Sequence, residues 1–164
     1  MTDKNKPFRP MTAEEAFRRL SALCARSEQC SHDATEKMRR WGVSDEEQAA
    51  VMERLTRERY IDDSRYARAF VKEKLRFNHW GQRKIEQALW LKRIDREVAE
   101  EALGEITADD YVAILRPLWK QKARTVKANT EYERQRKLAA WAVGRGFTFD
   151  VIRQAGGADI EEEE

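Results

Sequence analysis

Residues 38–44 read Met-Arg-Arg-Trp-Gly-Val-Ser, in which the end of a helical stretch is followed by an apolar residue and a helix-capping residue. The closing pair, Val43-Ser44, recurs as Ile94-Asp95 and Phe147-Thr148, each time after another helical stretch. The interval between copies is about fifty residues, and a fixed period of that size indicates a repeat architecture. Repeat proteins act through extended surfaces, so we expect function on a surface and not in a buried pocket.

Helix-capping residues divide the chain into nine expected helices, because a Ser, Thr or Asp oxygen satisfies a backbone N–H that the first turn leaves unpaired. Thr12, Ser44 and Thr130 each have Glu three residues on, which predicts a full capping box, and Thr107 with Asp110 is a related pair. Further starts are expected at Ser31, Asp62, Gly81, Asp95 and Thr148. The starts fall into three groups of three, and no segment reads as a strand. The sequence therefore predicts an all-α protein of three tandem three-helix repeats forming an elongated, curved array.

The expected organisation follows from these starts. We predict a flexible N-terminus over 1–11, repeats over 12–60, 61–106 and 107–157, and an acidic disordered tail over 158–164. Apolar residues at helical spacing, such as Ala13, Ala16, Phe17 and Leu20, agree with this division. Pro117 interrupts a long helix, where a kink or restart is expected.

Composition narrows the class of partner. Charged residues make up 38% of the 164 residues and the net charge is +2, but the charge is uneven. Residues 65–93 and 116–137 are basic, and residues 95–110 are acidic, which favours a charged partner. The sequence contains no apolar run of membrane-spanning length and no apolar signal region at its start, so we expect a cytoplasmic protein without membrane contact.

No catalytic or metal-binding pattern emerges from the sequence. Cys24, Cys30 and His32 lack a fourth zinc ligand unless His79 supplies it, so we expect no metal site. Phosphate loops, nucleophile elbows and metalloprotease motifs are all missing. We therefore expect a protein that is not an enzyme, with no catalytic residues, no cofactor and no small-molecule substrate.

The stretch from Tyr60 to Val71, Tyr-Ile-Asp-Asp-Ser-Arg-Tyr-Ala-Arg-Ala-Phe-Val, resembles the central signature of the RecX regulatory proteins. The pattern Gly-x-x-x-Ile-x-x-x-Leu over residues 81–89 and the elements around 137–147 and 151–152 resemble further parts of that family. Two departures are Arg93, where the family usually has Gly, and Ala34, where a larger aliphatic is common. The signature positions are Tyr60, Asp62, Asp63, Tyr66, Ala67, Phe70, Val71, Gly81, Ile85 and Leu89.

The resemblance implies a regulator of DNA repair, recombination and the SOS response. RecX-like proteins bind the RecA recombinase filament on DNA, lodge in its groove, and generally suppress strand exchange, ATP hydrolysis and co-protease activity. The resemblance implies that the protein contacts DNA either through the filament or by weak direct binding. It also implies a monomer. The alternative is a helical DNA-binding module that acts directly on nucleic acid.

Basic side chains and one aromatic form the expected partner surface. Four of them follow a single helical stripe that starts at Arg65, and Trp80 lies in the loop beyond it. For any one of these residues, a solvated helix face is the alternative interpretation. We expect Tyr66 and Phe70 in the core, Trp41 and Trp90 packed between helices, and Asp62 with Asp63 capping a helix. The candidate contacts are Arg65, Arg68, Lys72, Arg76, Trp80, Arg83, Lys84, Lys92, Arg93, Lys120, Lys122, Arg124 and Lys127.

Overall fold

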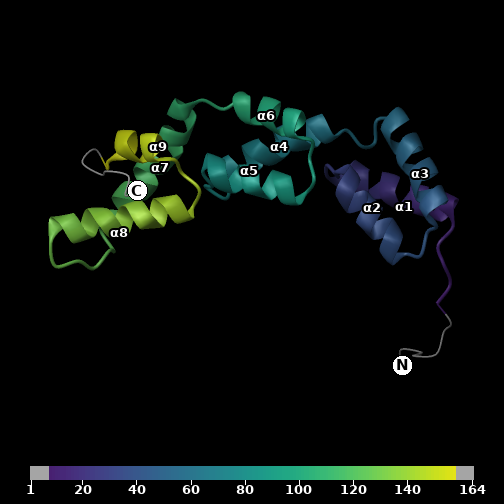
Figure 1. The fold of residues 1–164 in the computed structure, drawn as a ribbon, viewed down its shortest axis with the longest axis horizontal. Helices are drawn as coiled ribbons and strands as arrows, with labels where there is room; N and C mark the ends of the chain where they lie inside the picture. Colours follow the sequence, from purple (N-terminus) through teal and green to yellow (C-terminus); the bar gives the residue numbers. More distant parts are fainter. Residues whose placement is uncertain (1–7, 158–164) are drawn as a thin grey trace. The chain divides into compact units, whose positions relative to one another are not determined.

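A computed structural model describes residues 8–157, and within that range the chain forms helices and no strand (Figure 1). The helices are α1 (Ala13–Arg26), α2 (Ser31–Arg40), α3 (Asp45–Arg57), α4 (Asp63–Arg76), α5 (Gln82–Leu91), α6 (Arg96–Gly104), α7 (Ala108–Ala123), α8 (Glu131–Gly144) and α9 (Phe149–Ala155). Every expected start coincides with a helix start to within one residue. The all-α fold with helices in groups of three is therefore confirmed.

The described chain divides into two compact units, one up to Tyr66 (the N-terminal unit) and one from Ala67 on (the C-terminal unit). Helix α4 begins in the first unit and continues into the second. The expected bounds of the three repeats and the curvature of the array stay predictions. Residues 1–7, part of the predicted flexible N-terminus, and 158–164, the predicted acidic tail, lie outside the described range.

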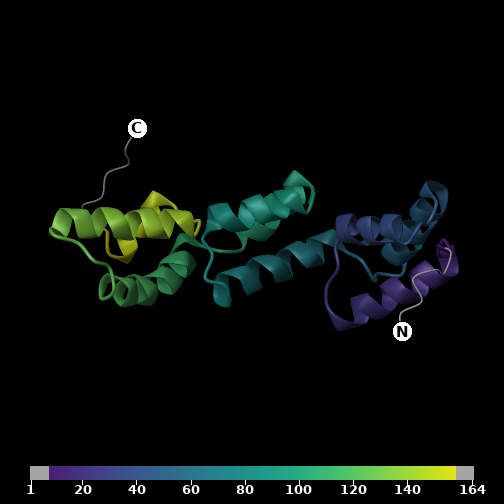
Figure 2. The ribbon, with the colours of Figure 1, turned by 90° about the horizontal axis from the view of Figure 1, so that it is seen from below.

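The N-terminal unit packs α1 and α2 against α3 (Figure 2). Its centre is apolar, as the helical spacing predicts, and burial of such side chains is the main favourable term in folding. Cys24 packs against this core from α1, and Cys30 is fully buried before α2. The fully buried side chains include Leu20, Met38, Leu55 and Ile61.

The C-terminal unit packs α5 on α6, and α7 on α8 and α9. Helix α7 continues through Pro117 as one helix and ends at Ala123, so the expected restart does not occur. Pro117 is exposed, whereas Leu115 and Trp119 on either side of it are buried. The buried face on both sides of the proline holds the helix together despite the missing N–H. Other buried residues of this unit are Val71, Ile85, Leu89, Tyr111, Leu138, Phe147 and Ile152.

The recurring pair at Val43-Ser44, Ile94-Asp95 and Phe147-Thr148 is a helix stop. In each copy the backbone N–H of the apolar residue donates to the carbonyl five residues earlier, and the preceding residue has a positive φ, which is the Schellman arrangement. The bonds are Val43 to Met38 at 3.1 Å, Ile94 to Leu89 at 3.2 Å and Phe147 to Ala142 at 3.2 Å. The φ values are 75° at Gly42, 53° at Arg93 and 97° at Gly146. The apolar side chain is buried in all three copies.

The expected capping boxes form only in part. Thr12, Ser44 and Thr130 accept the backbone N–H of the residue three positions on, as predicted. Within residues 8–157 the reciprocal bond appears only at Thr107 with Asp110. Two of the three other glutamates have different partners: Glu15 accepts from Arg9, and Glu133 accepts the N–H of Asn129. Helix α2 begins at Ser31 as expected, but its N-cap residue is Cys30.

Candidate functional site

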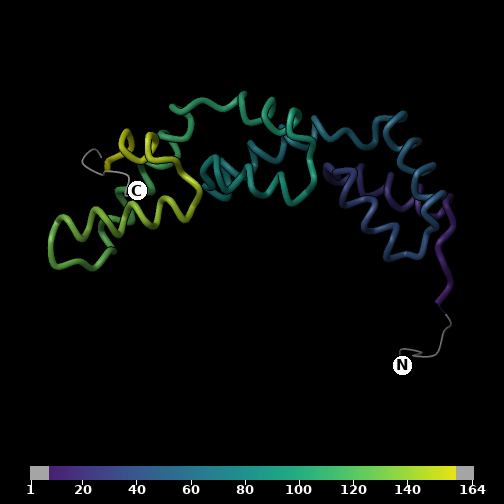
Figure 3. The backbone as a smooth tube through the Cα atoms, viewed as in Figure 1, coloured from purple at the N-terminus to yellow at the C-terminus, as the bar shows by residue number. Residues whose placement is uncertain are grey.

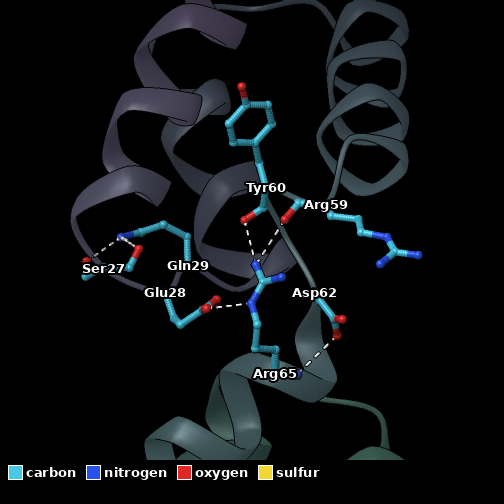
Figure 4. A network of polar contacts seen from close by, with 7 residues as sticks. All are labelled: Ser27, Glu28, Gln29, Arg59, Tyr60, Asp62 and Arg65. Carbon is cyan, nitrogen blue, oxygen red and sulfur yellow. Dashed lines mark hydrogen bonds and ion pairs between the residues drawn. The ribbon is translucent and has the colours of Figure 1, made fainter.

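Arg65, the first residue of the predicted basic stripe, is held inside the N-terminal unit (Figure 4). Its Nε lies 2.5 Å from a carboxylate oxygen of Glu28, and its Nη2 donates to the carbonyls of Arg59 and Tyr60, both at 3.1 Å. The hydrogen bond to Glu28 raises the pKa of Arg65 above its usual value. The guanidinium therefore ties the loop after α1 and the turn after α3 to the first turn of α4.

The aspartate pair of the signature caps two different helices. Asp62 Oδ1 accepts the N–H of Arg65 at 3.1 Å, which caps α4 as expected. Asp63 Oδ1 accepts the N–H of Ser31 at 2.8 Å, at the start of α2. The N-cap residue of α2, Cys30, makes no side-chain cap bond, so Asp63 supplies the missing acceptor from thirty-two residues away. This explains why the cap residue of α2 need not be polar.

The aromatic and aliphatic signature positions are mainly packing residues. Tyr66, Ala67 and Val71 are buried, as expected. Phe70 is half-buried, with the Lys74 ammonium 5.3 Å from its ring centroid. Tyr60 stays 38% exposed and meets the Phe17 ring edge-on, at 5.8 Å between centroids. The signature thus builds the start of α4.

The remainder of the predicted stripe on α4 is open to a partner. Arg68 is half-buried, and Lys72 and Arg76 are exposed. Lys72 lies 3.9 Å from the carboxylate of Glu105, but both side chains are about half exposed. An ion pair at that exposure contributes little and exchanges easily for another anion.

The junction between α5 and the turn after α8 is a backbone-to-backbone contact in the C-terminal unit (Figure 3). The N–H of Gly81 donates to the carbonyl of Arg145 at 2.8 Å, and the N–H of Arg83 donates to that of Gly146 at 2.9 Å. A Cβ on Gly81 would lie 2.2 Å from the Phe147 nitrogen. The glycine of the Gly-x-x-x-Ile-x-x-x-Leu pattern is therefore needed for this close approach.

Gly146, in the turn after α8, lies on the other side of the same junction. Its φ of 97° favours glycine, and an added Cβ would lie 2.4 Å from Cβ of Lys84. The carbonyls that follow α8 thus satisfy the first N–H groups of α5, which the helix itself leaves unpaired. The N-cap residue Gly81 has no side chain that could do so.

Arg145 adds a side-chain clamp to this junction. Its Nε donates to the carbonyl of His79 at 3.3 Å, and its Nη2 donates to that of Asn78 at 2.7 Å. The clamped loop contains His79 at a φ of 56° and leads to Trp80. Arg145 belongs to the C-terminal motif in the sequence, but its spacing gives no sign of a partner sixty-six residues away.

Two tryptophan rings near this junction each have two cations close by. The ammonium groups of Lys74 and Lys84 lie 5.1 and 4.7 Å from the Trp80 ring centroid. Lys122 and Arg145 lie 6.0 and 5.9 Å from that of Trp141. Trp80, Lys84 and Lys122 were predicted contacts, whereas the other three were not. We call Lys74, Trp80, Lys84, Lys122, Trp141 and Arg145 the cation–tryptophan cluster.

The remaining predicted contacts lie at helix ends and loops. Arg93 is exposed at the end of α5, and Lys92 beside it is half-buried. Lys120, Arg124 and Lys127 are exposed at the end of α7 and beyond it. Arg83 is exposed at the start of α5. Each is at least partly exposed to solvent.

The expectation that Trp90 packs between helices is wrong, because its side chain is 75% exposed. The buried face of α5 is set by Ile85 and Leu89, four residues apart, and a residue one step further turns about 100° away from it. Trp41 is half-buried, with the Arg19 guanidinium 4.7 Å from its ring centroid. Trp90 therefore does not repeat the packing role of Trp41.

The described residues offer no sign of metal chemistry or reactive thiols. Among residues 8–157 no three His, Cys, Asp or Glu side chains gather as metal ligands. Burial raises the pKa of the Cys30 thiol to about 11, and burial together with Glu28 raises that of Cys24. A thiol with a raised pKa is a poor nucleophile. No helix in the same range is long and apolar enough to cross a membrane.

The fold defines a class of tandem three-helix repeat proteins, and solved structures share it. The chain superposes on the crystal structure of RecX from Lactobacillus salivarius with a TM-score of 0.79, covering 87% of this chain and 93% of that one. A crystal structure of a regulatory protein RecX gives 0.80, covering 87% and 72%. Both are 20% identical in sequence, so the likeness concerns the fold.

Sequence comparisons identify the family. The models for the second and third three-helix domains of RecX match residues 62–103 and 109–155. Regulatory protein RecX of Prosthecochloris aestuarii is 36% identical over 118 residues, which is 72% of this chain and 76% of that protein. Its counterpart in Geobacillus kaustophilus is 27% identical over 157 residues, and the match spans 57% of that protein. The chain belongs to the RecX family of regulatory proteins, which confirms the resemblance seen in its sequence.

Proposed function

We propose that this protein binds RecA filaments on DNA and lowers their recombinase, ATPase and co-protease activity. Membership of the RecX family is the observation that carries the proposal. The arrangement of accessible basic residues in the C-terminal unit supports it, because a nucleoprotein filament presents both phosphates and acidic protein surface. Its relatives carry the name of regulatory proteins, which agrees with a chain that has no recognisable catalytic motif.

We assign partner contact to the part of the α4 stripe that is open. Arg68, Lys72 and Arg76 extend toward the end of the helix, and within residues 8–157 none of them has a set of hydrogen bonds like that of Arg65. Arg65 is left out of this surface, because Glu28 and two carbonyls already bind its Nε and Nη2 groups. Several such contacts, repeated along a filament, would add up through avidity.

Co-sedimentation with RecA filaments preassembled on single-stranded DNA tests this assignment. The variant R68E/K72E/R76E should stay in the supernatant at protein concentrations where the wild type pellets, since each change replaces attraction by repulsion. A matched control is R18E/R26E/R40E, which reverses three exposed charges in the N-terminal unit. Circular dichroism should show equal helicity in both variants. Equal pelleting of the two variants would remove the stripe from the partner surface.

The second candidate function is a helical module that binds DNA without RecA. The cation–tryptophan cluster favours it, because it places cations that no carboxylate of residues 8–157 pairs with beside aromatic rings. A salt titration separates the two candidates. A dedicated DNA module would bind bare DNA as tightly as RecA-coated DNA at physiological salt, whereas a filament regulator would bind RecA-coated DNA more tightly.

A further inference from the structure

We infer that the cation–tryptophan cluster is a sequence-independent binding site for the phosphate backbone of single-stranded DNA. Binding at this site needs no recombinase, so it extends the proposed function by naming the surface that faces the nucleic acid. The inference rests on the proposed function in one respect only: the DNA bound in the cell is the DNA inside a RecA filament.

The cluster is continuous across the junction of α5 and α8. Lys74 at the end of α4 and Lys84 at the start of α5 both lie against Trp80. Cβ of Lys84 lies close to Gly146, and the next residue back, Arg145, reaches the loop carbonyl of His79. Arg145 and Lys122 of α7 in turn lie against Trp141 on α8. All six residues lie in the C-terminal unit, so their spacing is set by one packed body.

The cations of the cluster are not neutralised by the protein. Across residues 8–157, no ion pair joins Lys74, Lys84, Lys122 or Arg145 to a carboxylate. Other basic residues of the same unit do have such partners: Lys72 pairs with Glu105, Arg134 with Glu131 and Lys137 with Glu133. The positive charge of the cluster is therefore available to an external anion.

The rings and carbonyls hold the cations in position before a ligand arrives. A cation over an indole face is attracted by the ring quadrupole, which restricts a long side chain that would otherwise be free. Arg145 is fixed further by its bonds to Asn78 and His79. Binding a phosphate then costs less side-chain entropy than binding at an unrestrained surface lysine.

Alternating cations and aromatic rings favour nucleic acid over an acidic protein surface. Proteins that bind single strands without sequence preference combine a basic track with aromatic platforms. The charged groups of the cluster are three lysines and one arginine, and we assign them to phosphates, whose contacts carry no sequence information. Fluorescence of Trp80 and Trp141 should report the ligand directly, because displaced cations change the surroundings of both rings.

Fluorescence anisotropy with a labelled oligo-thymidine, without RecA, tests the site at salt concentrations from about 50 to 200 mM. The variant K84Q/K122Q removes two cluster cations and should weaken binding, lowering the slope of log affinity against log salt by about 1.4, or 0.7 for each lost single-strand phosphate contact. The control R18Q/R26Q removes two exposed cations from the N-terminal unit and should leave both affinity and slope unchanged. W80F should bind like the wild type, and W80L should bind more weakly, because only the latter loses the ring.

An equal effect of K84Q/K122Q and R18Q/R26Q would overturn the site, since it would reduce the cluster to general positive charge. Co-sedimentation with RecA filaments, run on the same variants, separates the two proposals. Wild-type protein that binds filaments but not free DNA would overturn the DNA site and assign the cluster to an acidic protein surface. Protein that binds DNA through the cluster without binding filaments would sustain the site and refute the proposed function.

Discussion

The turn after α5 and the turn after α8 share one backbone design but differ in what surrounds them. Both close a helix through a residue of positive φ followed by a buried apolar residue. After α5 the positive-φ residue is Arg93, which is exposed. After α8 it is Gly146, which lies against Lys84 and whose carbonyl accepts the N–H of Arg83. The first turn therefore ends a helix, and the second also joins two groups of helices within the C-terminal unit.

This difference explains why glycine is required at one turn and replaceable at the other. A positive φ alone costs a non-glycine residue about 1–2 kcal/mol, which a packed domain can absorb. A close backbone approach excludes every side chain, because the neighbouring atoms cannot move without breaking their own bonds. The positive φ of Arg93 is thus tolerated.

The largest expected effect is on stability when Gly146 becomes Ala. Its Cβ would lie 2.4 Å from that of Lys84, and its φ is 97°, so we expect G146A to lower the free energy of unfolding by about 2–4 kcal/mol. Urea denaturation followed by circular dichroism measures this. The matched control is G144A, two residues earlier, where an added Cβ meets nothing within 4 Å. G144A should be neutral or slightly stabilising, since alanine favours a helix, and equal losses would refute the packing explanation.

A smaller effect is expected when the clamp at the second turn is removed. R145A should lower the free energy of unfolding by about 1–2 kcal/mol, because the carbonyls of Asn78 and His79 lose a charged donor. R93A makes the same change at the exposed turn, and we expect it to alter stability by less than about 0.5 kcal/mol. Equal losses in the two variants would mean that the clamp contributes nothing to the junction.

The smallest effect has the opposite sign. R93G should raise the free energy of unfolding by about 0.5–1 kcal/mol, because glycine adopts the positive φ of 53° without strain. The greater entropy that glycine gives the unfolded chain offsets part of this stabilisation. Thermal unfolding should show the corresponding rise in midpoint. A lower midpoint would indicate that the Arg93 side chain makes a stabilising contact.

Much of the fold follows from local chemistry that the sequence displays. Cap residues such as Ser44 and Thr107 mark helix starts, and the recurring pair marks helix stops, because both depend on neighbours within a few residues. Asp62 and Gly81 were likewise placed correctly at helix starts. The expectation for Trp90 rests on its position near a helix end, whereas the spacing of Ile85 and Leu89 turns it away from the core.

The candidate site was less accessible to sequence analysis. The sequence predicts that Arg65 belongs to a basic stripe, and only the folded structure shows that Glu28 lies beside it. Arg145, which lies beside Trp141, bonds the carbonyls of Asn78 and His79 next to Trp80, more than sixty positions away in the sequence. Such contacts depend on how helices pack, which periodicity does not encode. That Lys74 and Lys84 form no ion pair within the described range is visible only in three dimensions.

The central claim is that this chain regulates RecA through its filament. The most direct test is the single-stranded-DNA-dependent ATPase rate of RecA, measured with this protein at sub-stoichiometric amounts. We expect the rate to fall, to fall less with R68E/K72E/R76E, and to fall as in the wild type with R18E/R26E/R40E. An unchanged ATPase rate, together with no co-sedimentation with filaments, would contradict the claim.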